Sequence, residues 1–158
     1  MKVISTSVLK LIVPAAIAAC AAWISGCATN SASSPVGPKI QQMSAVIRVC
    51  DSLTPGCSGE SSISLGALHD LQVSVDWTNM PGGTHSQQIA FLLPNGVVYQ
   101  TASHGFAVPD GTLGSPTVSD GMAVAGTYIT QRQLTGNWVV QVSLDGAMIG
   151  SQQVTLEP

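Results

Sequence analysis

The 158-residue chain is poor in charge and in aromatic side chains, which make up 8% and 4% of its residues. Basic residues are the scarcest. After residue 26 only three remain, against eight acidic residues, so this part carries a formal charge of −5. A protein that binds nucleic acid needs a basic face to neutralise phosphates. The composition therefore excludes nucleic acid as a partner.

Motifs for catalysis and metal binding are also missing. The sequence has no G-x-S-x-G elbow, P-loop, H-E-x-x-H motif or EF-hand loop. The three histidines, His69, His85 and His104, are scattered and lack a second ligand at i+2 or i+4. We favour solvent-exposed loop histidines over a zinc or copper site. The sequence thus predicts a protein that is not an enzyme and has no metal or cofactor.

The chain has no apolar run long enough for a stable membrane span. Residues 11–24 are uncharged and mostly aliphatic, but they are fewer than the roughly 20 that a transmembrane helix needs, and they include Pro14. Lys2 and Lys10 precede or border this stretch. A short positive region followed by a brief apolar run is typical of an export signal. We therefore predict a signal peptide at residues 1–26.

The end of this signal carries the most specific motif in the chain. Ile24-Ser25-Gly26-Cys27 resembles the lipobox of bacterial lipoprotein precursors. The resemblance implies that the Cys27 thiol receives diacylglycerol, that cleavage occurs just before it, and that an N-acyl chain such as palmitate follows. Because Ala28 and not Asp comes next, it also implies outer-membrane sorting in a Gram-negative host. The expected location is the bacterial cell envelope, with a lipid anchor as the membrane contact.

Two alternatives to Cys27 are open. Residues 17–20 also fit the lipobox pattern, but use of Cys20 would leave the apolar residues 21–24 at the mature N-terminus. The chain turns polar directly after Cys27, so we favour Cys27. An ordinary secretory signal with incidental cysteines is the third possibility.

The remainder divides into a tether and one domain. Residues 27–44 are rich in Ser, Asn, Thr, Gly and Pro without apolar periodicity, and a flexible coil of about 17 residues spans about 20–25 Å. Residues 45–158 are enough for one domain and too few for two.

Alternation with a period of two dominates this domain. Residues 71–78 and 138–144 alternate apolar and polar side chains, which is typical of strands with one buried face. Asn95-Gly96 and Asp145-Gly146 favour tight hairpin turns, although Pro94 can lengthen the first. We expect seven or eight strands, drawn from residues 45–50, 61–65, 71–78, 89–93, 97–99, 122–130, 138–144 and 147–156.

Residues 134–146, LTGNWVVQVSLDG, resemble the penultimate strand and final hairpin of bacterial immunoglobulin-like and fibronectin type III-like modules. The resemblance implies a single antiparallel immunoglobulin-like β-sandwich, an all-β fold. We place the two tryptophans in its core and not on a carbohydrate-binding surface. The expected core includes Trp77, Phe91, Trp138, Val140, Val142 and Leu144.

Cys50 and Cys57 are the pair that is left once Cys20 leaves with the signal and Cys27 is lipidated. Pro55-Gly56 between them supplies a chain reversal. In an oxidising compartment we therefore predict a disulfide.

Two glycine-rich stretches, residues 79–85 and 105–121, read as loops. Loops at the ends of sandwiches often hold ligands, so Met80, His85, His104 and Phe106 are the candidate binding residues. Turn-forming composition without a ligand is the alternative.

Two functions fit these features. The chain is a lipid-anchored display module for another envelope protein, a glycan or a surface polymer, or it is a structural accessory subunit of a larger envelope assembly.

Overall fold

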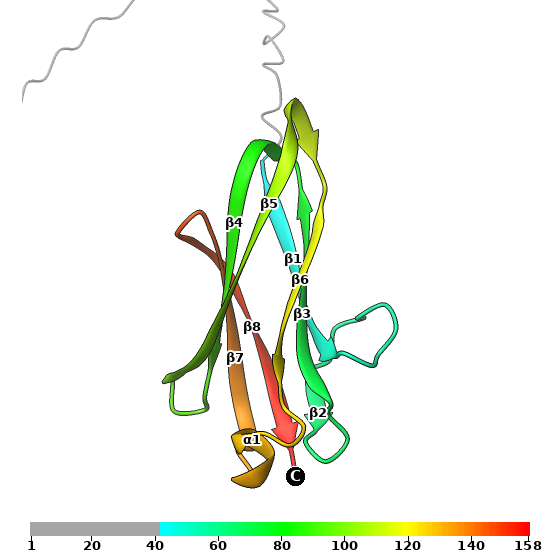
Figure 1. The fold of residues 1–158 in the computed structure, drawn as a ribbon, viewed down its shortest axis with the longest axis vertical. Coiled ribbons are helices and arrows are strands. Elements are labelled where there is room, and N and C mark those ends of the chain that lie inside the picture. The colour runs from blue at the N-terminus through cyan, green and yellow to red at the C-terminus, as the bar shows by residue number, and fades with distance from the viewer. Residues whose placement is uncertain (1–41) are drawn as a thin grey trace, which may run out of the picture. The chain divides into compact units, whose positions relative to one another are not determined.

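The computed structural model describes residues 42–158 (Figure 1). The predicted signal peptide, Cys27 and nearly all of the predicted tether lie outside the described residues. Between residues 42 and 158 no helix is long and apolar enough to cross a membrane. The elements are β1 (Ser44–Asp51), β2 (Ser62–Ser64), β3 (Asp70–Thr78), β4 (Met80–Leu92), β5 (Val98–Gly114), β6 (Thr117–Ala123), α1 (Tyr128–Gln131), β7 (Gly136–Leu144) and β8 (Ala147–Glu157).

The strands form two sheets, of order β1-β3-β6 and β2-β8-β7-β4-β5. This is the strand order of an immunoglobulin-like sandwich, with β1, β3 and β6 as strands A, B and E and with β4, β5, β7 and β8 as C, C′, F and G. It confirms the predicted all-β fold of eight strands. In the part of the chain that the structure describes, no strand D lies beside β6.

One strand pair departs from the predicted antiparallel arrangement. β2 pairs with β8 in parallel, over residues Ser62 to Ser64. The chain leaves the first sheet at the end of β1 and enters the second without reversing its direction. β2 therefore runs the same way as β8, which leaves the second sheet mixed.

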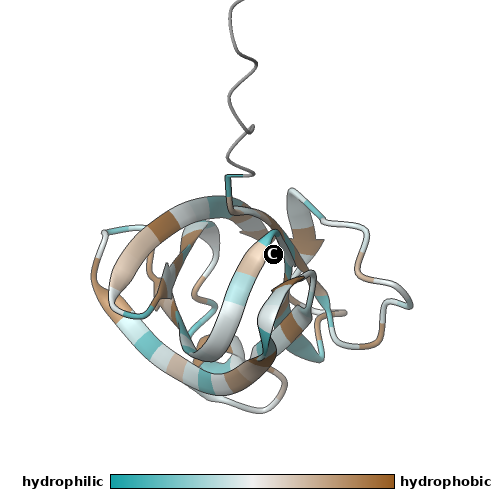
Figure 2. Cartoon of the chain, turned by 90° about the horizontal axis from the view of Figure 1, so that it is seen from above, coloured by the Kyte–Doolittle hydropathy of each residue, from teal (hydrophilic) through white to brown (hydrophobic). Residues whose placement is uncertain are grey.

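The core lies between the sheets, and buried side chains alternate with less buried ones along β7. Hydrophobic and hydrophilic bands lie along the strands in Figure 2. Trp77 Nε1 donates a hydrogen bond of 3.0 Å to Gln87 Oε1, and Trp138 Nε1 donates one of 3.0 Å to the Leu134 carbonyl. Burial of both tryptophans confirms that they belong to the core. All six predicted core residues are buried: Trp77, Phe91, Trp138, Val140, Val142 and Leu144.

Both predicted hairpin turns are present. Asp145 and Gly146 both have positive φ, as a tight primed turn requires. At Asn95-Gly96 only Gly96 has positive φ, and the Leu93 amide donates to the Val97 carbonyl at 2.9 Å. The β4–β5 connection is therefore a three-residue loop that begins with Pro94.

The predicted loop at residues 79–85 is wrong, because β4 begins at Met80. Its Pro-Gly-Gly sequence produces a shift in the β4–β5 register and not a loop. A Cβ on Gly82 would lie 2.6 Å from the carbonyl oxygen of Pro109 on β5. Glycine at this position permits the close approach of the two strands.

The predicted bounds of one loop and one strand are also wrong. Residues 105–114 belong to β5, and β6 begins at Thr117, so the predicted loop at 105–121 shrinks to a short connection. The strand predicted at 122–130 ends at Ala123. Thr127 then caps α1 by accepting a bond from the Ile129 amide, and Ile129 is buried within this helical turn.

Candidate functional site

The four predicted binding residues lie on β4 and β5. Met80 is fully buried, and Phe106 is half-buried against the core. His85 and Phe106 are partners in the β4–β5 register, with ring centroids 5.6 Å apart. Their predicted placement in loops is wrong. That they contact a partner stays a prediction, and only His104 among them is well exposed.

His85 ties β4 to the β7–β8 turn. Its Nδ1 lies 2.9 Å from Asp145 Oδ2, and its Nε2 lies 2.9 Å from the Pro81 carbonyl oxygen. Both neighbours are acceptors, so the doubly protonated imidazole satisfies both bonds. The hydrogen bond to Asp145, then that to Pro81, raises the pKa of His85. The His85 hydrogen bond, then that from the Ser86 amide, lowers the pKa of Asp145.

This geometry makes His85 a structural contact. Only 10% of its side chain is exposed, which contradicts the prediction of a solvent-exposed loop histidine. His69 and His104 are exposed and lie 3.0 Å and 3.9 Å from Asp70 and Asp120. Across residues 42–158 no three His, Cys, Asp or Glu side chains gather as a metal site would require.

The outer face of the three-stranded sheet carries a covered patch. A disulfide joins Cys50 and Cys57, which confirms that prediction. Cys50 lies on the outward phase of β1, opposite to the core residue Val49. The disulfide therefore folds the β1–β2 loop back over the outside of the sheet, and it places Cys57 beside Ser74 of β3. The disulfide-held loop explains why Ser74 is buried although its side chain lies on the outer face of the sheet.

An ion pair crosses the same face. Arg48 of β1 pairs with Asp76 of β3, and Thr117 of β6 donates to the other carboxylate oxygen of Asp76 at 2.7 Å. The Thr117 hydrogen bond, followed by the bond from Arg48, lowers the pKa of Asp76. Arg48 is therefore already neutralised by a partner within its own sheet.

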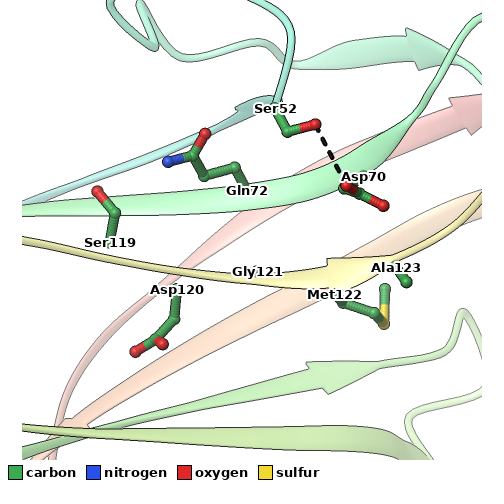
Figure 3. Close-up of a pocket in the computed structure, with 8 residues that line it drawn as sticks. All are labelled: Ser52, Asp70, Gln72, Ser119, Asp120, Gly121, Met122 and Ala123. Carbon is green, nitrogen blue, oxygen red and sulfur yellow. Dashed lines mark hydrogen bonds between the residues drawn. The ribbon is translucent and has the colours of Figure 1, made fainter.

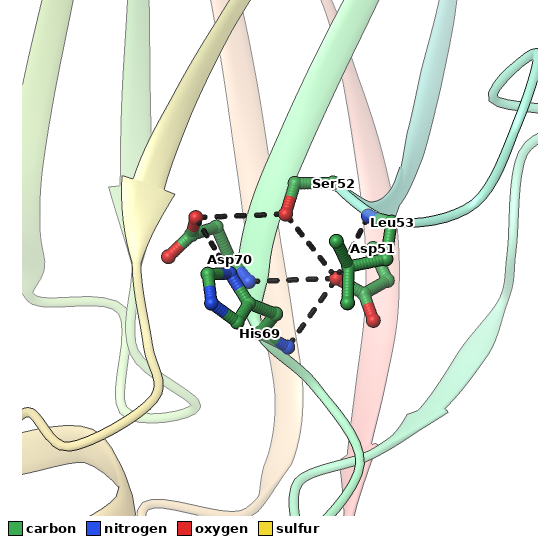
Figure 4. A network of polar contacts seen from close by, with 5 residues as sticks. All are labelled: Asp51, Ser52, Leu53, His69 and Asp70. Atoms are coloured by element: carbon green, nitrogen blue, oxygen red, sulfur yellow. Dashed lines mark hydrogen bonds and ion pairs between the residues drawn. The ribbon is translucent and has the colours of Figure 1, made fainter.

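At the far end of β1 a carboxylate organises the chain (Figure 4). Asp51 Oδ1 accepts bonds from the amides of Leu53, His69 and Asp70 at 3.3–3.4 Å. The Ser52 hydroxyl lies 3.5 Å from Asp51 Oδ1 and from Asp70 Oδ2. Ser52 thus contacts carboxylates, and the imidazole of His69 contacts Asp70. The network closes the end of the β1–β3 pair. The His69 imidazole contacts Asp70 and not the Ser52 hydroxyl, whereas a serine nucleophile needs a base within hydrogen-bond distance.

Next to this network an open groove follows β6, the edge strand of the three-stranded sheet (Figure 3). Ser119 and Gln72 lie on its outer side, whereas Asp120 points to the inner side, where Met122 also lies. Asp120 therefore occupies a core-facing position between Val118 and Met122. The groove is lined by Ser52, Asp70, Gln72, Ser119, Asp120, Gly121, Met122 and Ala123.

The sequence interpretation missed this groove. One signal was available, because Val118, Asp120 and Met122 share one phase of a strand, and an acid among apolar neighbours breaks the pattern. The glycines and prolines of residues 105–121 instead favour a loop, which hides that phase. The groove is the candidate functional site, because it combines two acidic side chains with a sheet edge that has no neighbouring strand among residues 42–158.

No protein-family model and no curated protein sequence matches the chain. Among solved structures it is similar to the alkylpurine DNA glycosylase AlkC of Pseudomonas fluorescens, with 17% identity and a TM-score of 0.49 over 73% of this chain. The chain spans 30% of that glycosylase. It is also similar to an immunoglobulin-like protein of Pseudomonas aeruginosa, with 10% identity and a TM-score of 0.47 over 73% of this chain and 97% of that one.

A putative β-galactosidase of Bacteroides fragilis matches at 10% identity and a TM-score of 0.38, over 71% of this chain and 16% of that chain. Likenesses of this size carry no conclusion about ligand or activity. The class of the protein rests on its own strand order, which is that of an immunoglobulin-like β-sandwich.

Proposed function

We propose that this chain is a lipid-anchored protein of the bacterial cell envelope that displays a non-catalytic immunoglobulin-like sandwich to a protein, glycan or surface polymer. The observation that carries the proposal is the lipobox-like sequence ending at Cys27, followed after a short polar segment by a single sandwich that begins at Ser44.

The shape of the sandwich supports display. β1 begins at one end of the long axis, and the C-terminus lies at the opposite end (Figure 1). A chain anchored ahead of β1 would therefore hold the opposite end, with α1 and the β2–β3 connection, away from the attachment point. Outer-membrane sorting is part of the proposal for a Gram-negative host.

Replacement of Cys27 tests the anchor. We expect Cys27→Ala to abolish incorporation of labelled fatty acid, to leave unprocessed precursor and to shift the protein out of the lipid-modified membrane pool. Cys20→Ala is the matched control and should be processed and lipidated normally. Intact-mass analysis of the wild type would contradict the proposal if it found an unmodified N-terminus, or a lipid on Cys20.

A structural accessory subunit is the second candidate, favoured by the unpaired edge of β6. Extraction in mild detergent separates the two functions. A stoichiometric partner that survives high salt supports the subunit, and recovery of a monomer supports the display module.

A further inference from the structure

We propose that the free edge of β6 binds an extended peptide strand that carries one cationic side chain, which pairs with Asp120. The added strand would occupy the position of the missing strand D and extend the three-stranded sheet to four. This inference rests only on the display role of the sandwich and not on the lipid anchor.

The hydrogen-bond pattern gives the direction of the free backbone groups. The Trp77 amide donates to the Pro116 carbonyl at 3.0 Å, and the Val124 amide donates to the His69 carbonyl at 3.3 Å. In an antiparallel ladder, hydrogen-bonded positions alternate with non-bonded ones. Even-numbered residues of β6 therefore bond to β3, and the backbone groups of odd-numbered residues point to the free edge.

Three of these odd-numbered residues lie along the groove: Ser119, Gly121 and Ala123. Within residues 42–158 their backbone groups have no hydrogen-bond partner. Their side chains are small, uncharged and exposed. Proteins commonly protect edge strands with lysine, proline, a bulge or an inward-pointing charge. None of the first three occurs at these positions, and the inward charge of Asp120 disfavours any added strand that does not bring a matching cation. Main-chain pairing with an added strand is therefore unobstructed by outward side chains.

Asp120 supplies the specificity. It lies on the core-facing side of β6, its side chain is 18% exposed, and its Oδ2 is buried without a hydrogen-bond partner among the described residues. His104 of β5 faces it from the other sheet, with Nδ1 3.9 Å from Oδ1. Since Arg48 is paired with Asp76, no guanidinium of the sheet neutralises this carboxylate. A cation from a partner would do so.

The pairing of an added strand with β6 then predicts the residue pattern of the bound peptide. A residue opposite Asp120 would sit in a non-hydrogen-bonded pair, where side chains lie closest. Its neighbours at ±2 would face Val118 and Met122, which are buried apolar residues. Those at ±1 would lie on the outer face near Ser119 and Gly121. The expected pattern is apolar, polar, cationic, polar, apolar.

A second copy of this chain fits less well. β6 reads TVSDGMA and contains no basic residue. Pairing of two β6 edges would place Asp120 against an apolar residue, a small polar residue or another Asp120. We therefore commit to a cationic peptide, and a homodimer is an outcome of the test.

The test measures binding of a blocked peptide, Thr-Val-Thr-Lys-Thr-Val-Thr, to the full protein purified in detergent. We expect about tenfold weaker binding when the peptide lysine is replaced by glutamate. N-methylation of the peptide backbone opposite Ser119 should abolish binding, because it removes a ladder hydrogen bond. Amide exchange at Ser119, Gly121 and Ala123 should slow when the peptide is bound.

Matched protein variants complete the test. Asp120→Asn should weaken binding of the lysine peptide about fivefold and leave the glutamate peptide no weaker. Asp110→Asn, at an exposed acid outside the groove, should have no effect. Ser119→Pro removes an amide on the free edge and spares the ladder to β3, so it should keep the fold and abolish binding.

Equal binding of the lysine and glutamate peptides would overturn the proposal, as would peptide binding that leaves amide exchange along β6 unchanged. If Ser119→Pro unfolds the protein, the N-methylated peptide and the exchange measurement decide the question. Sedimentation of a wild-type dimer that Ser119→Pro dissociates would assign the edge to self-association. None of these results depends on the outcome of the Cys27 experiment.

Discussion

The two sheets of this sandwich solve the same packing problem in different ways. The five-stranded sheet anchors Trp138 with a backbone acceptor, the carbonyl of Leu134, only four residues away. The three-stranded sheet anchors Trp77 with a side chain of the other sheet, Gln87. It also carries a disulfide-held loop over its outer face.

This difference separates the roles of the sheets. The five-stranded sheet, called the wide sheet below, contains long antiparallel ladders between strands that follow each other in the chain, such as β4–β5 and β7–β8. The three-stranded sheet is called the narrow sheet. It depends on the wide sheet for the acceptor of its tryptophan N–H, and among residues 42–158 no strand pairs with the outer edge of β6. We infer that stability resides mainly in the wide sheet and that the narrow sheet carries the proposed binding surface.

Replacement of Trp138 is the strongest test of this division. Trp138→Ala should destabilise the domain by about 3–5 kcal/mol, because it leaves a large cavity in the core beside the wide sheet and removes the contact with Tyr99. A loss of that size approaches the whole stability of a small domain. Urea denaturation followed by far-UV circular dichroism measures it. An unchanged midpoint would show that Trp138 is not part of the stabilising core.

The disulfide tests the narrow sheet. Replacing Cys50 and Cys57 by serine should cost about 2–3 kcal/mol, because the closed loop is short and limits the entropy that the bond removes from the unfolded chain. The sandwich should stay folded, with faster amide exchange confined to the β1–β2 loop and the strand pairs beneath it. Global unfolding of the double variant would contradict the division between the sheets.

Gln87 tests the link between the sheets. Gln87→Leu leaves the buried Trp77 N–H without an acceptor, but it also removes an Nε2 group that has no partner among the described residues. We expect these effects to offset in part, with a net loss of about 1 kcal/mol. Urea midpoints measure it. A gain in stability would mean that the unpartnered amide costs more than the tryptophan bond contributes.

Much of the fold follows from periodicity. The alternation at residues 71–78 and 138–144 identified β3 and β7 and their core faces, because a strand with one buried face leaves a period of two in its sequence. Cys50 and Cys57 were paired by elimination. These predictions needed only local pattern and the count of cysteines.

The candidate site could not be predicted in the same way. Glycines at 82 and 83 signal a loop locally, whereas here Gly82 permits a close approach between β4 and β5 that only the tertiary structure reveals, and Gly83 adopts a positive φ. Residues 122–130 were expected to form one strand, but Ala123 ends β6 and a capped helical turn follows. The free edge of β6 depends on which strands are neighbours, and that order is not contained in any single segment.

The smallest effect is expected at the contact between β4 and the β7–β8 turn. Because the pKa of His85 is raised above its ordinary 6.5, the contact with Asp145 stabilises the fold below that pH and is lost as pH rises through the folded pKa. The pKa of Asp145 is lowered below 3.8, so its contribution is present above that value and is lost as pH falls through the folded pKa. The pair should therefore stabilise the fold most between about pH 4 and 6.5, by at most about 1 kcal/mol because half of the Asp145 side chain is exposed.

Urea midpoints at pH 5.5 and 8.5 measure this dependence in the wild type, His85→Gln, Asp145→Asn and the double variant. Each single variant should remove the same part of the pH dependence, and the double variant should remove no more. A wild-type slope that persists in His85→Gln would show that another group is responsible.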